Sequence, residues 1–138
     1  MPVKIEKDSK RPHDTVRVVY TGSWTISEFL KTIETFVESQ GQEIYIQFAI
    51  HDYRQQNSPS ADLIHRFDLL SIRFEQTQHI VTFLLGQTGI AHVMTKSFFK
   101  VYPKFYERHQ IIIAETEEII YAKIEEIMHA RHGSNGND

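Results

Sequence analysis

The sequence predicts an α/β protein, a single domain in which a mixed, mostly parallel sheet of four to five strands is covered by about four helices. Short runs of β-branched and aromatic residues alternate along the chain with longer segments whose apolar residues recur at helical spacing. Turn and capping residues separate these segments, a pattern typical of parallel strands joined by helical crossovers. In such folds, ligands and partners are usually bound at the carboxyl ends of the strands.

Length and composition agree with one domain. A chain of 138 residues, of which 41% are hydrophobic, is long enough to bury a core of its own. We expect the domain to span residues 1–132. Residues 133–138 are polar and contain two glycines, and they predict a flexible C-terminal tail.

Charge and residue usage argue against several classes of protein. The 15 Lys and Arg residues are outnumbered by 18 Asp and Glu residues, so the basic excess of a nucleic-acid-binding domain is missing. No cysteine is present, which favours a reducing cytoplasm and excludes thiolate metal sites. The first residues lack the apolar region of a signal peptide, and no stretch approaches the ~20 apolar residues of a membrane span. We therefore expect a soluble, cytoplasmic protein.

The N-terminal segment predicts an antiparallel edge of the sheet followed by a helix. A short strand at Val3–Glu6 and a stronger strand at Thr15–Tyr20 are separated by a polar turn. Thr25 lies three residues before Glu28, the spacing of a capping box, and apolar residues at helical intervals follow until Gly41.

The middle of the chain predicts a strand, a loop and a second helix. Residues Glu43–His51 alternate in polarity as a strand with unequal faces does, and the polar residues 52–57 predict a loop. Ser58 is followed by proline and then by the helical stripe that begins with Leu63 and Phe67, which together indicate the start of a helix.

The remaining residues predict two more strands and two more helices. The run His79–Leu85 does not alternate, as in a strand that is covered on both faces. A third helix is expected over residues 88–102 and is ended by Pro103. Ile111–Ile113 predicts a short buried strand, and Thr116–Met128 predicts a capped amphipathic helix with acidic residues in its first turn.

The order of these elements resembles a known family. A strand hairpin ends in Thr21-Gly22-Ser23-Trp24, a later strand ends in His51-Asp52 before a serine-bearing helix start, and the last strand is followed by the acidic turn 114–120. This order is similar to that of the STAS domain, the fold of anti-sigma-factor antagonists, and more closely to the bacterial STAS-like regulatory domains. The resemblance covers Val3–Met128.

The resemblance implies a non-catalytic regulatory module that binds another protein. In the family, a serine at the start of the helix after the second long strand is phosphorylated by a kinase that is also the binding partner. Asp52 resembles the aspartate at that strand end, and Ser58 or Ser60 stands where the phosphorylated serine would be. Phosphate at a helix N-terminus adds about −1.5 to −2 charges beside unsatisfied amides. The family's Asp-Ser-Ser-Gly pattern is absent here, and Ser58 also fits an ordinary helix cap.

Residues at the expected strand ends form a candidate binding site. The loop Gly86-Gln87-Thr88-Gly89 lacks the lysine of a phosphate-binding loop and the third glycine of a dinucleotide fingerprint, which favours a tight turn. Together with residues 22–24 it would line a shallow pocket if the two strands were neighbours. Trp24 also fits a hydrophobic staple against the first helix. The candidate residues are Trp24, Asp52, Gly86 and Gly89.

An aromatic segment is a candidate interface. Its density of rings exceeds what one amphipathic stripe needs, so a second copy or another protein could bind there as a homodimer or complex. The same rings could instead close the core. The residues are Phe98, Phe99, Tyr102, Phe105 and Tyr106.

Two other functions stay open. The aromatic residues could line a cavity for a small molecule or lipid. A small hydrolase could use His51 and Asp52 with Ser23 or Ser58, although no Gly-x-Ser-x-Gly elbow is present to expose the serine. The histidines lack the spacing of a zinc motif, and we expect neither a metal nor a cofactor.

Overall fold

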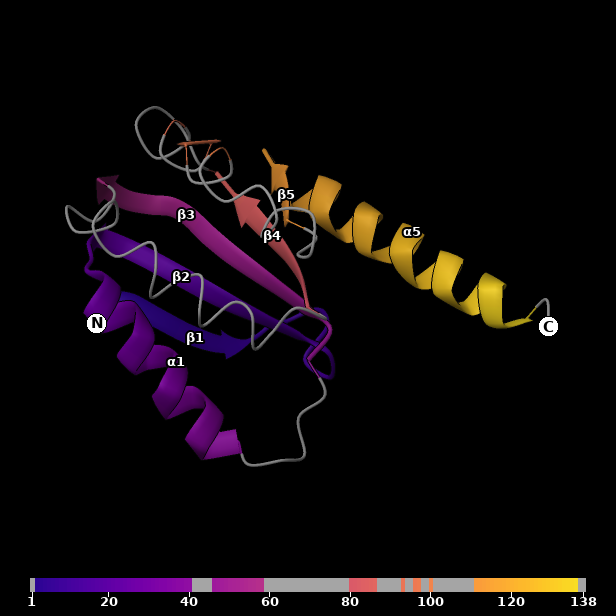
Figure 1. Cartoon of the computed structure of the whole chain (residues 1–138), viewed down its shortest axis with the longest axis horizontal. Coiled ribbons are helices and arrows are strands. Elements are labelled where there is room, and N and C mark those ends of the chain that lie inside the picture. Colours follow the sequence, from indigo (N-terminus) through magenta and orange to yellow (C-terminus); the bar gives the residue numbers. More distant parts are fainter. Residues whose placement is uncertain are drawn as a thin grey trace.

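A computed structural model describes residues 2–40, 46–58, 80–86, 93, 96–97, 100 and 111–136 of the chain. These residues form a five-stranded sheet in the order β1-β2-β3-β4-β5 and two helices (Figure 1). The strands are β1 (Val3–Lys7), β2 (Thr15–Ser23), β3 (Phe48–Ser58), β4 (Val81–Leu85) and β5 (Ile111–Ala114), and the helices are α1 (Ile26–Gln40) and α5 (Glu117–Gly136).

The topology confirms the α/β prediction and the mixed, mostly parallel sheet. β1 pairs with β2 in antiparallel orientation, whereas the pairs β2–β3, β3–β4 and β4–β5 are all parallel. The predicted antiparallel edge at the N-terminus is therefore correct. Of the four expected helices, the described part of the chain contains the first and the last, and the expected second helix lies outside it, as does most of the third.

The expected loop over residues 52–57 is wrong, because β3 continues without interruption to Ser58. Its polar residues remain extended because β2 pairs with β3 along its whole length, from Thr15 opposite Phe48 to Ser23 opposite Ser58. The register shifts after Val19 and again after Gly22, so the pairing is irregular near its end. Asp52 therefore lies within a strand and not at its end.

The two strands farthest from the N-terminus differ in burial. All five residues of β4 are buried, which confirms the predicted interior strand. β5 is the outer strand of the sheet, and Ile113 is 39% exposed, so the expectation of a buried last strand is wrong. The strand order also places β3 between β2 and β4, so residues 22–24 and Gly86 are not on neighbouring strands, which the expected pocket between them required.

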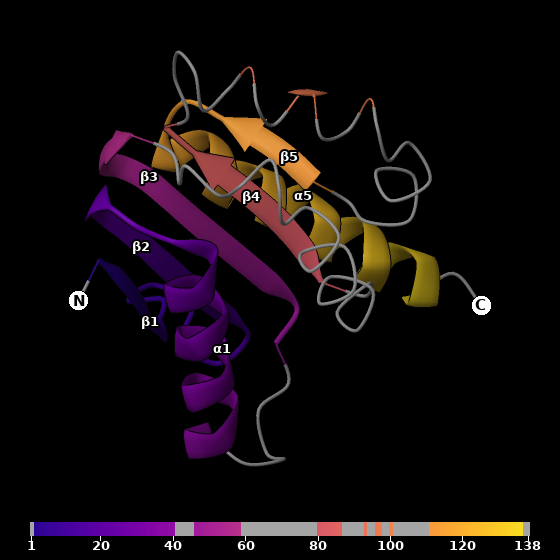
Figure 2. The ribbon, with the colours of Figure 1, turned by 60° about the vertical axis from the view of Figure 1, so that its left-hand side comes forward.

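The two helices lie on opposite faces of the sheet, as a comparison of the two views shows (Figures 1 and 2). Each covers one cluster of buried apolar side chains. Under α5 the cluster comes from β3, β4, β5 and the helix itself: Phe48, Ile50, Val81, Phe83, Leu85, Ala114, Ile120 and Ile124. Under α1 it comes from β1, β2 and the helix: Val3, Val18, Tyr20, Trp24, Ile26 and Phe29.

The helix starts form as the sequence predicts. The Thr25 hydroxyl accepts a hydrogen bond from the Glu28 amide at 3.1 Å, as a helix cap does, and donates to the Glu28 carboxylate at 3.1 Å. Trp24 packs against Phe29 with ring centroids 6.3 Å apart, as a hydrophobic staple does. Thr116 caps α5 by accepting from the Ile119 amide at 3.3 Å.

α5 continues to Gly136, into the segment expected as a tail, while the domain boundary at residue 132 stays a prediction. Among the helices that the structure describes, none has the length and apolar character needed to cross a membrane.

Candidate functional site

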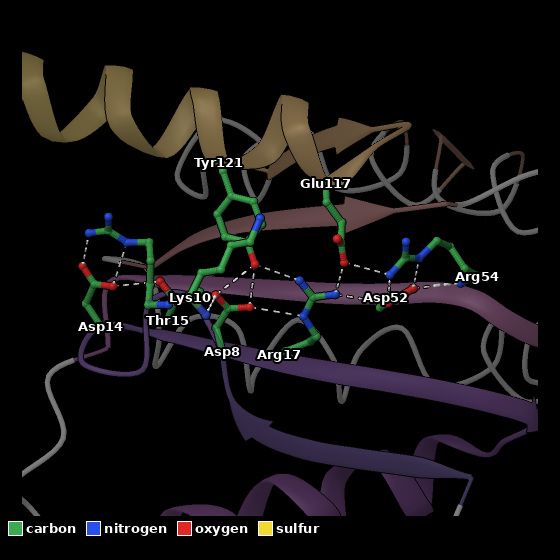
Figure 3. Close-up of polar contacts among 10 residues, drawn as sticks. Asp8, Lys10, Asp14, Thr15, Arg17, Asp52, Arg54, Glu117 and Tyr121 are labelled. Atoms are coloured by element: carbon green, nitrogen blue, oxygen red, sulfur yellow. Dashed lines mark hydrogen bonds and ion pairs between the residues drawn. The ribbon is translucent and has the colours of Figure 1, made fainter.

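A cluster of charged side chains lies on the α5 face of the sheet, and Arg17 is at its centre (Figure 3). The alternation of β2 directs Val16 and Val18 to the α1 face and Arg17 to the other face. The Arg17 guanidinium donates to Asp8 at 3.3 Å, to Asp52 at 3.4 Å, to Glu117 at 2.6 Å and to the Tyr121 hydroxyl at 3.0 Å. One side chain thus joins β2 to the end of β1, to β3 and to α5. We call these five residues, together with Arg54, the charge cluster.

Asp8 is the most deeply buried acid of the charge cluster, with a side chain that is 0% exposed. Both of its oxygens accept from the Tyr121 hydroxyl, at 2.8 and 2.9 Å, and one of them also accepts from the amides of Lys10 and Arg11. The carboxylate therefore closes the turn after β1 and holds α5 at the same time. A buried carboxylate with this many donors is a structural anchor.

Asp52 and Arg54 extend the cluster along β3. Arg54 binds both carboxylate oxygens of Asp52, at 2.9 and 2.7 Å, and also reaches Glu117 at 2.9 Å. Burial alone would raise the pKa of Asp52, but the hydrogen bonds from the Arg54 side chain and backbone lower it below its usual value. The hydrogen bond from Arg17 likewise lowers the pKa of Glu117. Both acids are therefore ionised at neutral pH.

Gly86 makes room for Arg54. Its backbone has φ of 76°, a conformation that L side chains rarely adopt, and a Cβ atom there would overlap Cγ of Arg54. A glycine is therefore needed after β4 to leave room for Arg54, which the sequence alone did not indicate.

A second ion pair ties the turn between β1 and β2 to α5. Arg11 binds both oxygens of Asp14, at 3.1 and 2.7 Å, and reaches Glu125 on α5 at 3.1 Å. The Lys10 ammonium lies 4.6 Å from the centre of the Tyr121 ring. The α5 partners of these contacts recur every four residues at 117, 121 and 125, which puts them on one stripe of the helix beside the buried isoleucines.

On the opposite face of the sheet, His51 lies in an aromatic pocket under α1. Its Nδ1 is 2.7 Å from the Tyr20 hydroxyl, and its ring lies near those of Tyr20, Phe29 and Tyr53. Burial lowers the pKa of His51 to about 4, so the imidazole is neutral at pH 7. Burial also raises the pKa of Tyr20 well above its usual value. This pair is part of the core.

The expected hydrolase residues are not assembled. His51 and Asp52 are consecutive in β3 and therefore point to opposite faces of the sheet, where Tyr20 and Arg54 are their respective partners. Ser23 and Ser58 pair with each other at the ends of β2 and β3. The described residues thus hold no His-Asp-Ser relay of the kind that the sequence left open.

The remaining candidates have varied positions. Trp24 is buried, and its indole donates to Gln56 at 3.0 Å. Ser58 is the last residue of β3. The other candidate site and interface residues lie outside the described part of the chain: Ser60, Gly89, Phe98, Phe99, Tyr102, Phe105 and Tyr106. No group of acidic and histidine residues in the described ranges could hold a metal ion.

An open groove runs between the edge strand β1 and α1. It has a volume of about 670 Å³ and is lined along one side by residues 2–7 and along the other by α1 residues that include Glu28, Lys31 and Phe36. Within the described residues, β1 pairs only with β2, so its outer edge borders this groove. The sequence predicted the edge but not the groove.

The charge cluster also escaped prediction, although the sequence carries a signal for it. Arg17 lies between two valines in β2, which pairs with β1 on one side and with β3 on the other. An arginine inside such a strand requires buried acidic partners. The spacing of Glu117, Tyr121 and Glu125 supplies the complementary helix face. The cluster was missed because residues 52–57, which include Asp52 and Arg54, were interpreted as a loop.

Comparison of the chain with protein-family models, curated proteins and solved structures gave no match.

Replacing Arg17 with Met should cost far more stability than replacing Arg54 with Met. Arg17→Met leaves the carboxylates of Asp8 and Asp52, 0% and 5% exposed, without their shared cation, and we expect a loss of about 3–5 kcal/mol. Arg54 is 47% exposed, and its removal should cost about 1 kcal/mol. Urea unfolding of both variants measures this difference, and equal losses would contradict the central position of Arg17.

The stability of the protein should decrease in mild acid because of His51. Its pKa is about 4 when folded against 6.5 for an exposed histidine, so the unfolded chain binds more protons between these values. The free energy of unfolding should therefore fall by about 3 kcal/mol as pH drops through this window. The pKa values of Asp52 and Glu117 are lowered in the folded protein, so most of the stability that these ionised acids contribute is lost below this pH window.

The matched variant is His51→Gln, which keeps a hydrogen-bonding group beside Tyr20 but does not titrate. Urea unfolding at about pH 7 and about pH 4.5 should show a smaller loss in this variant than in the parent protein. Equal losses would show that His51 is not buried in its neutral form.

Proposed function

We propose that this chain is a non-catalytic protein-interaction module, a regulatory domain of the bacterial STAS-like kind, which binds an extended segment of a partner along β1. The observation that carries the proposal is the outer edge of β1 beside the groove toward α1. An exposed strand edge is a template for another strand, and a groove beside it can accept that strand's side chains. The family resemblance of the sequence supports the regulatory part of the proposal, and the structure supports its α/β fold.

The backbone of β1 supports this proposal through the direction of its peptide groups. The Thr21 amide donates to Pro2 at 2.8 Å and the Asp8 amide donates to Thr15 at 2.9 Å. In an antiparallel pair the residues alternate between facing the partner strand and facing away. Because the register is continuous from Val3 to Lys7, the even-numbered residues face β2 and Val3, Ile5 and Lys7 face the groove. These three residues present amides and carbonyls to an incoming strand.

We further propose that a serine after β3 regulates this module in the cytoplasm. The family resemblance supports Ser58 or Ser60 as the phosphorylated residue, and Ser58 lies two residues beyond Gln56, the partner of Trp24. A phosphate there would introduce about −1.5 to −2 charges at the ends of β2 and β3. The aromatic segment 98–106 is proposed as a second contact surface.

A small apolar ligand or lipid is the second candidate occupant, because the groove volume lies within the range of about 300–1,000 Å³ seen for ligand pockets. A protein strand fits the site better. The groove is open along its length, and its lining includes charged residues of both strand and helix, among them Lys7, Glu28 and Lys31.

Proline at position 7 should abolish partner binding, whereas alanine should not. Lys7 is exposed and its amide faces the groove, so Lys7→Pro removes an outward donor and leaves the bonds to β2 intact. Peptides selected on the parent protein from a display library of unstructured sequences are titrated against both variants. We expect Lys7→Ala to bind as the parent does and Lys7→Pro to bind at least about tenfold more weakly.

Circular dichroism establishes that both variants are folded. Peptides that bind the two variants equally well would contradict the proposed use of the β1 edge, and so would a selection on a monomeric parent that yields no binder.

A further inference from the structure

We propose that the partner strand at this edge is β1 of a second copy of the chain, so that two sheets join across a two-fold axis at Ile5. This inference rests on the proposed function of the β1 edge and names its occupant. It is carried by the sequence of β1, Val-Lys-Ile-Glu-Lys, together with the direction in which each of its residues faces.

The backbone allows this pairing. A two-fold axis at Ile5 places Ile5 opposite its own copy and Val3 opposite Lys7 of the partner subunit. All of these residues have amides and carbonyls that face outward, so each of these pairs can exchange hydrogen bonds in the antiparallel pattern. An isologous contact of this kind closes on itself as a dimer and leaves no further β1 edge to propagate.

The side chains select this register. With the axis at Ile5, Lys4 lies directly opposite Glu6 of the partner subunit, and Glu6 lies opposite the partner's Lys4. These residues sit on the face away from α1, because Val3 and Ile5 pack on the α1 side. The side chains of Lys4 and Glu6 are 67% and 46% exposed, and within one chain Nζ of Lys4 lies 3.3 Å from Oε2 of Glu6. In the dimer, these side chains form a ladder of alternating charges across the two strands. Opposite charges across strands stabilise pairing.

The neighbouring registers are disfavoured by the same charges. An axis at Lys4 places two lysines opposite each other, and an axis at Glu6 places two glutamates opposite each other. An axis between residues would bring outward-facing residues against residues whose peptide groups already bond to β2, and no ladder could form. Of the antiparallel registers centred on Lys4, Ile5 or Glu6 or between these residues, only the one at Ile5 satisfies both backbone and charge.

The groove beside β1 agrees with a strand as its occupant. In the proposed dimer, the side chains of Val3, Ile5 and Lys7 from the partner subunit project to the α1 side, where the groove of about 670 Å³ lies. The apolar part of its lining includes Val3, Ile5 and Phe36. The two α1 helices would then lie on the same face of one continuous sheet.

Charge reversal tests the register directly. Lys4→Glu makes residues 4 and 6 both acidic and Glu6→Lys makes them both basic, so each variant repels its own copy but matches the other. Light scattering over a concentration series measures the mass of each protein and of their equimolar mixture. We expect the parent to be a dimer, each single variant to dissociate at least about tenfold more readily, and the mixture to form a one-to-one dimer.

Two controls separate the contact from the fold. Lys123→Glu reverses a charge on α5, away from β1, and should remain as dimeric as the parent. Hydrogen exchange should slow at the amides of Val3, Ile5 and Lys7 on dimer formation, whereas those of Lys4 and Glu6 are already protected by β2.

A parent protein that stays monomeric at high concentration would overturn the inference, and so would a mixture that fails to associate. A parent dimer unaffected by Lys4→Glu would place the dimer contact elsewhere in the chain. In all three cases the peptide titration with Lys7→Pro still decides whether the β1 edge binds another partner, so the two proposals fail separately.

Discussion

The buried guanidinium of Arg17 is the constraint on which the other charged contacts depend. Its charge lies between a sheet and a helix and is compensated by Asp8, Asp52 and Glu117. Burial opposes the charged form, but hydrogen bonds to Glu117 and Tyr121 outweigh this effect and raise the pKa of Arg17. Isolated, such a charge would be costly; with these partners it fixes how the end of β1, the middle of β3 and the start of α5 meet.

This arrangement makes the two faces of the sheet unlike each other. Among the described residues, the α1 face is apolar and aromatic, and His51 there is neutral. The α5 face is apolar over β4, β5 and the first residues of β3 but charged over β2 and at Asp52 and Arg54 of β3. The helix α5 therefore packs its isoleucines on one side and reaches the charge cluster with Glu117 and Tyr121 on the other. Since apolar burial does not specify direction, we infer that the charge cluster specifies the rotation and register of α5.

The outer edge of β1 follows from the same construction. Asp8 closes the turn after β1, and its side chain contacts α5. The edge of β1 is therefore short, and its charges alternate. Charged side chains on an edge strand discourage indiscriminate pairing. Among the antiparallel registers of β1 with its own copy that are centred on Lys4, Ile5 or Glu6, the charges of Lys4 and Glu6 are complementary in the one at Ile5, on which the proposed dimer is built.

Much of the fold could be predicted from local signals. The helix cap at Thr25, the cap at Thr116 and the unbroken apolar run of β4 each depend on short-range chemistry, and the structure confirms all three. The length of β3 and the charge cluster could not be predicted in this way. Asp52 and Arg54 belong in a strand because Arg17 and Glu117 lie next to them in space, although these partners are distant in sequence. Interactions between distant residues here override local polarity.

The link between the two ends of the chain provides the most direct test of this account. Tyr121 on α5 donates to both oxygens of Asp8 beside β1, so the free energies of unfolding of Asp8→Asn, Tyr121→Phe and the double variant form a double-mutant cycle. The charge cluster predicts a coupling energy of about 1–3 kcal/mol between these residues, as for a hydrogen bond to a buried charge. Additive losses, with no coupling, would contradict the position of α5 over the end of β1.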